Sequence, residues 1–136
     1  MMRGRLLERL MLLYGAASLV HFVHNAAYLD AYPNMPGWLT PTGVMASWML
    51  VAAVGFLGYS LLKRGHGRWG AFFVAAFACL GFAGLDHYAI APVSAHTLAM
   101  RATITAEVVL AGVLLAAVIW LAMTGRLNQR STGSAR

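Results

Sequence analysis

The chain has 136 residues, of which 60% are hydrophobic and only 10% are charged. Soluble domains average about half apolar and about a quarter charged residues, so this composition excludes an ordinary soluble protein and predicts an integral membrane protein. The net charge of +6 does not indicate nucleic-acid binding, because the basic residues lie at the ends of apolar segments and not on one soluble face.

A transmembrane helix needs about 20 predominantly apolar residues. Four segments meet this requirement, at about 6–29, 43–62, 69–88 and 97–123. Three prolines between the first two segments and a glycine-rich basic turn between the next two interrupt the helices. Short connections make neighbouring helices antiparallel. The sequence therefore predicts an all-α, single-domain, four-transmembrane-helix antiparallel bundle, followed at 125–136 by a polar, flexible tail.

The distribution of basic residues predicts the orientation of the bundle. Nine lie near one side of the membrane: Arg3, Arg5, Arg9, Lys63, Arg64, Arg68, Arg126, Arg130 and Arg136. Arg101 alone lies near the other. Because cytoplasmic loops carry the excess of Lys and Arg, we expect both the N and C termini to be cytoplasmic in a multi-pass protein of the inner (plasma) membrane.

Ionisable residues gather in the outer half of three of the four segments. At a rise of about 1.5 Å per residue, His21 and Glu107 lie at similar depths, roughly 13 Å and 15 Å below the outer boundary. The residues near this level are His21, His24, Asp86, His87, His96 and Glu107. Unpaired ionisable groups in a bilayer are costly, so we expect them to face the interior of the bundle.

Helical spacing indicates which further residues share that interior face. Steps of three and four residues connect Tyr14, Ser18, His21, Asn25 and Tyr28 in the first segment, and His96, Met100, Thr103 and Glu107 around the last. We therefore expect a polar pocket or second shell made of Tyr14, Ser18, Asn25, Tyr28, Asp30, Met100 and Arg101.

The leading interpretation of the six ionisable residues is a transition-metal site. Imidazole suits zinc, iron and copper, and bundle cores hold such ions with imidazoles and carboxylates from facing helices. The predicted ligands are drawn from His21, His24, Asp86, His87, His96 and Glu107. The pattern does not distinguish the three metals, and it leaves open whether the site is catalytic.

Three alternatives use the same residues without a metal ion or with a haem. One is a structural network in which Arg101 is the counter-charge of Asp86 or Glu107. Another is a pocket for a lipid- or sterol-like molecule, with His, Asp and Glu as proton carriers. The last is a b-type haem with His21 or His24 opposite His87. So small a chain also fits a homo-oligomer or a subunit of a larger membrane complex.

The lipid-pocket alternative has a parallel in the layout of known proteins. A polar pocket between four helices, with an acidic residue at the end of the first, resembles in architecture alone the membrane domains of the sterol isomerase and sigma-2 receptor type. The resemblance implies an isomerase-like enzyme or a binding protein for such a molecule.

The remaining conspicuous residues favour ordinary structural roles. We expect Cys79 to be a small buried hydrophobic residue. Tyr32, Tyr88, Trp38 and Trp69 lie near predicted helix ends and are typical of membrane-interface anchors. The second segment lacks ionisable groups, and its Ser47, Gly55, Gly58 and Tyr59 indicate close helix packing.

Overall fold

The computed structural model describes residues 2–125, and these contain helices and connecting turns but no strand. The elements are α1 (Met2–Ala27), η1 (Leu29–Ala31), α2 (Pro41–Lys63), α3 (Gly67–Leu80), η2 (Gly81–Leu85), α4 (Asp86–Ile90), η3 (Val93–Ala95) and α5 (Leu98–Met123). Four stretches are long and apolar enough to cross a membrane: Arg5–Ala27, Pro41–Lys63, Gly67–Ile90 and Leu98–Met123. The all-helical prediction with four candidate spans is confirmed. The predicted tail, apart from Gly125, lies outside the described residues.

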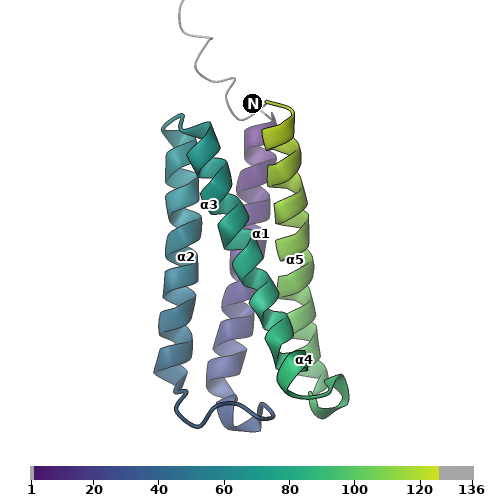
Figure 1. Cartoon of the computed structure of the whole chain (residues 1–136). Coiled ribbons are helices and arrows are strands. Elements are labelled where there is room, and N and C mark those ends of the chain that lie inside the picture. The colour runs from purple at the N-terminus through teal and green to yellow at the C-terminus, as the bar shows by residue number, and fades with distance from the viewer. Residues whose placement is uncertain (1, 126–136) are drawn as a thin grey trace, which may run out of the picture.

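The four long helical stretches run side by side as a bundle (Figure 1). Helix α1 packs against α2 and α5, and α3 packs against the same two helices. The start of α1, the turn between α2 and α3, and the end of α5 lie together at one end, which we call the basic end (Figure 1). The opposite end, with α4 and the loop between α1 and α2, is called the histidine end.

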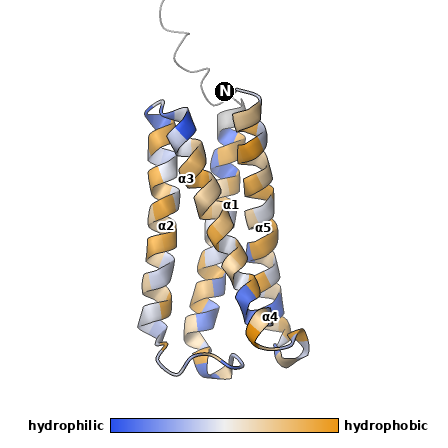
Figure 2. Cartoon of the chain, in the orientation of Figure 1, coloured by the Kyte–Doolittle hydropathy of each residue, from blue (hydrophilic) through white to orange (hydrophobic). Residues whose placement is uncertain are grey.

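Hydrophilic residues occupy different positions at the two ends (Figure 2). At the basic end they lie in the turn between α2 and α3 and at the start of α1. At the histidine end they extend along α1 into the bundle and gather around α4 (Figure 2).

Local sequence signals explain where the helices begin. Thr40 caps α2 by accepting a hydrogen bond from the backbone N–H of Gly43, and Pro41 occupies the first turn, where a missing N–H is tolerated. Thr97 caps α5 in the same way, accepting from the N–H of Met100. Gly65, with φ of 84°, takes the left-handed conformation in the tight turn after α2.

The third span differs from the continuous helix expected at 69–88. It begins as α3, tightens into the 3-10 turn η2, and resumes as α4. A Cβ atom on Gly81 would lie 2.6 Å from the Tyr14 hydroxyl and 2.8 Å from the Ala111 Cβ. Only glycine therefore allows η2 to approach α1 and α5 this closely, and the tightened turn sets the position of α4.

Apolar packing fills the half of the bundle toward the basic end. Its buried core residues are Leu7, Tyr14, Ala71, Val74, Phe77, Ala78, Ala111, Leu114, Val118 and Leu121. The expected close packing at Gly55 and Gly58 is confirmed, since a Cβ would lie 2.9 Å from the Phe77 ring or 2.8 Å from the Val74 nitrogen. Ser47 is exposed and donates a hydrogen bond to the carbonyl of Gly43. The prediction for Cys79 is wrong, because its side chain is exposed on the outer surface of the bundle.

Candidate functional site

The polar stripe of α1 faces the interior over most of its predicted length. Ser18, His21 and Asn25 are buried, whereas Tyr28 is exposed. Tyr14 is also buried, but its hydroxyl donates to the carbonyl of Phe77 at 3.0 Å, so it belongs to the apolar core. The polar face of α1 thus begins at Ser18 and ends at Asn25.

Helix α5 places Glu107 opposite His21. The two side chains are 2% and 4% exposed, and the His21 Nε2 and Glu107 Oε2 atoms are 3.7 Å apart. This distance is too long for a hydrogen bond. The close approach of η2 leaves little space behind the carboxylate, since a Cβ on Gly84 would lie 3.2 Å from the same Glu107 oxygen.

The other nitrogen of His21 has a defined partner on α5. Thr103 Oγ1 lies 3.4 Å from His21 Nδ1 and donates its own proton to the carbonyl of Met100 at 3.0 Å. The threonine oxygen is therefore an acceptor for an Nδ1–H of His21. In that tautomer the Nε2 lone pair points toward the side occupied by Glu107, where it is available to a ligand.

Two further histidines continue this arrangement toward the end of the bundle. His87, on α4, has its ring centre 5.4 Å from that of His21 and 6.2 Å from that of His96. Its Nε2 lies 3.1 Å from the side-chain nitrogen of Asn25. His96 precedes α5, and its Nδ1 donates to the carbonyl of Pro92 at 3.1 Å. Both rings are buried.

Tyr32 lies among these histidines, although the sequence indicated a membrane-interface anchor. It is 3% exposed, its ring centre is 4.9 Å from that of His87, and its hydroxyl lies 2.9 Å from His24 Nδ1. Burial raises the pKa of the Tyr32 hydroxyl, which therefore stays protonated and can donate to His24. The loop after α1 folds back over the end of the bundle, which helical periodicity does not reveal.

The other predicted site residues lie away from the His21–Glu107 pair. His24 is partly buried and turns toward Tyr32. Tyr28, Asp30, Asp86 and Arg101 are exposed. Arg101 forms no ion pair with Asp86 or Glu107, so the proposed internal counter-charge is wrong. Met100 is buried and packs with Tyr32 and Ile104.

We define the polar layer as Ser18, His21, Asn25, Tyr32, His87, His96 and Glu107. Three buried side-chain atoms in it have no hydrogen-bond partner: Asn25 Oδ1, His87 Nδ1 and His96 Nε2. Ser18 lies beside the Glu107 carboxyl group and can donate to it. An unpaired buried polar group costs about 1–3 kcal/mol. Within residues 2–125, no three His, Cys, Asp or Glu side chains are already arranged to hold a metal ion.

Comparisons of the chain with protein-family models, with curated proteins and with solved structures find no match. The fold and composition define an all-helical protein with four helices suited to crossing a membrane. Its distinguishing feature is the buried polar layer between α1, α4 and α5.

Proposed function

We propose that the polar layer binds a transition-metal ion between α1, α4 and α5. The observation that carries the proposal is the facing pair formed by His21 Nε2 and Glu107 Oε2, 3.7 Å apart and buried. Two ligand atoms about 2.1 Å from a tetrahedral ion lie about 3.4 Å from each other. A movement of a few tenths of an ångström would therefore bring both atoms to one ion.

His87 is the best candidate for a third ligand. Its ring lies edge to face with that of His21. Its Nε2 accepts from the side-chain nitrogen of Asn25, so its Nδ1 carries the proton, and ligation requires the loss of either that proton or the Asn25 contact. Binding would require this side chain to turn toward the His21–Glu107 pair, because three ligands do not already converge there. His96 has a free Nε2, because its Nδ1 is held by the Pro92 carbonyl, and it would serve an ion closer to the end of the bundle.

The neighbouring hydrogen bonds support a ligand role for His21. A metal-bound histidine usually donates its second N–H to a fixed acceptor, which orients the ring and selects the tautomer. Thr103 offers such an acceptor to His21. Imidazole and carboxylate together suit zinc, iron and copper, and an open coordination position on the ion would allow hydrolytic or oxidative chemistry.

A haem fits this arrangement less well than a single ion. His21 and His87, the candidate axial pair, contact each other edge to face with their ring centres 5.4 Å apart. A macrocycle would have to separate these rings and the helices that carry them.

The proposal includes the membrane orientation. The described basic residues Arg5, Arg9, Lys63, Arg64 and Arg68 belong to the basic end, which we place in the cytoplasm of a cell with the protein in its inner membrane. The polar layer would then lie near the outer or periplasmic face.

Elemental analysis and a visible absorption spectrum of the purified full chain test the metal proposal. We expect about one zinc, iron or copper ion per chain, and a sharp loss of metal in His21→Ala with the helical content retained. His66→Ala is the matched control, because His66 is exposed at the basic end. A folded wild-type protein that takes up no metal after incubation with each of the three ions would refute the proposal.

A further inference from the structure

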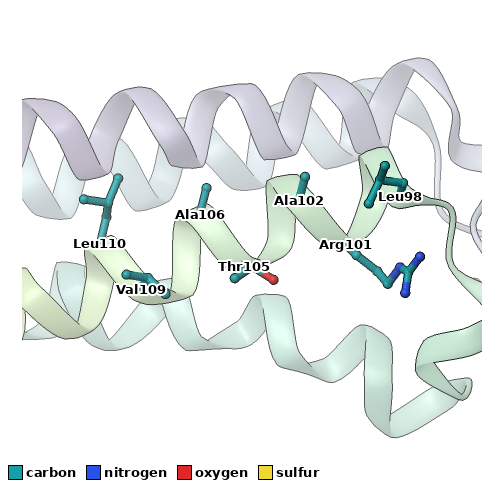
Figure 3. Close-up of a pocket in the computed structure, with 7 residues that line it drawn as sticks. All are labelled: Leu98, Arg101, Ala102, Thr105, Ala106, Val109 and Leu110. Atoms are coloured by element: carbon teal, nitrogen blue, oxygen red, sulfur yellow. The ribbon is translucent and has the colours of Figure 1, made fainter.

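A groove runs along the outward face of α5, apart from the polar layer (Figure 3). It lies between two rows of side chains. Within each row, successive residues are four positions apart in the sequence, the spacing that forms ridges on a helix. One row is Leu98, Ala102, Ala106 and Leu110, and the other is Arg101, Thr105 and Val109 (Figure 3). The first row has alanines in its middle and leucines at its ends.

Arg101 gives this apolar groove a positive charge near its end. The residue lies one turn into α5 at the histidine end, and its side chain is exposed. Among the described residues, its guanidinium has no ion-pair or hydrogen-bond partner. A guanidinium near the hydrocarbon region needs an anion or the interface, and its planar set of donors matches a phosphate group.

The length of the groove matches one leaflet of a bilayer. From Arg101 to Leu110 the helix rises about 14 Å. Half of a hydrocarbon core of about 30 Å is about 15 Å. A lipid whose phosphate lies at Arg101 would therefore have an acyl chain beside the groove residues from Ala102 to Leu110.

We propose that this groove binds one anionic phospholipid of the leaflet at the histidine end, with its phosphate on Arg101 and an acyl chain along α5. A second copy of the chain fits the surface less well. Beyond Leu110 the exposed face of α5 carries Val113 and Trp120. Ala102 and Ala106 have the spacing of small residues that allows helices to pair, but the bulk of Val113 and Trp120 opposes a close approach of the backbones along the rest of this face.

Native mass spectrometry of the detergent-solubilised full chain tests this site. The protein is incubated with equal amounts of dioleoyl phosphatidylglycerol and dioleoyl phosphatidylcholine, and the lipid retained is counted. We expect one phosphatidylglycerol to be retained preferentially, and roughly tenfold weaker retention in Arg101→Met, the loss expected for a charge-assisted hydrogen bond. Ala106→Leu fills the groove without removing the charge and should also release the lipid.

Two matched variants separate this site from general effects of charge and surface shape. Arg64→Met removes an exposed arginine at the basic end, and Ala53→Leu enlarges an exposed alanine on α2. Both should retain the phosphatidylglycerol. Equal losses in Arg64→Met and Arg101→Met would overturn the proposal in favour of unspecific charge attraction. A wild-type dimer that becomes monomeric in Arg101→Met would overturn it in favour of a second copy.

Discussion

The two ends of the bundle use polar residues in opposite ways. At the basic end the charges are outside, as in the partly exposed Lys63–Glu8 ion pair, and apolar side chains such as Leu114 and Val118 fill the interior. At the histidine end, Asp30, Asp86 and Arg101 are also exposed, but the interior is polar as well.

The exposed charges bear on the orientation of the protein in the membrane, and the buried polar groups bear on its chemistry. Surface charges at a membrane boundary bias the direction of insertion and contribute little to stability. Buried polar groups are costly unless they are paired, so a layer that leaves several without partners is the part of the molecule that gains most from a ligand. The predictions below test this contrast, beginning with the largest expected effect.

The first prediction concerns the direction of the two ends and has an all-or-none outcome. A reporter that is active only in the cytoplasm, fused after Arg136, should be active, because the described basic residues other than Arg101 lie at the end of the bundle where α5 ends. A periplasm-dependent reporter at the same position is the control and should be silent. The reverse pattern would place the polar layer on the cytoplasmic side.

The second prediction tests the junction at which the apolar half gives way to the polar layer. Gly81→Ala should lower the free energy of unfolding by about 1–3 kcal/mol, the usual cost of overpacking, because its Cβ meets Tyr14 and Ala111. Denaturant unfolding in micelles measures the change. Gly112→Ala is the matched control, since its Cβ would find only the Phe82 ring at 3.9 Å. Equal unfolding energies in the two variants would show that η2 does not need this close approach.

The third prediction concerns the loop that closes the histidine end. Tyr32→Phe removes the hydroxyl beside His24 and keeps the buried ring against His87. We expect a loss of about 0.6 kcal/mol, the average for polar contacts inside membrane proteins, measured by unfolding in micelles.

Trp38→Phe, in the same loop, is the control, because Trp38 is 79% exposed. It should leave the unfolding energy unchanged. A loss as large as that of Tyr32→Phe would mean that Tyr32 contributes no more than an exposed aromatic residue.

Sequence periodicity predicted most of the fold and part of the polar layer. Steps of three and four residues are fixed by the geometry of a helix, so the burial of Ser18, His21 and Asn25 followed from position alone. The helical rise per residue placed Glu107 at the depth of His21, and the two side chains face each other in the structure. Four apolar segments of sufficient length gave the four spans for the same local reason.

The contacts that periodicity missed depend on irregular backbone. Tyr32 lies in a loop directly before Pro33, where no repeat relates sequence distance to direction in space. The break at η2 determines how His87 faces the interior while the adjacent Asp86 is exposed. Both residues were predicted as site residues because they lie at a similar depth along the third segment. Gly81 and Gly84 are the sequence signal for the break. Their importance becomes clear only from the side chains of α1 and α5 that lie against them.

The last prediction compares two glutamates, one at each end, and expects the smallest effect. Glu8→Gln removes the carboxylate next to Lys63 at the exposed basic end, where water and headgroups can solvate the lysine. Neither the unfolding midpoint nor the bound metal should change measurably, because exposed ion pairs contribute little. Glu107→Gln makes the same chemical change inside the polar layer, where the proposed ion would lose a charged ligand, so bound metal should fall while helical content is retained. Metal analysis and circular dichroism of the two variants give both comparisons. If metal falls equally in both, the charge of the chain as a whole controls uptake, and the polar layer has no special role in it.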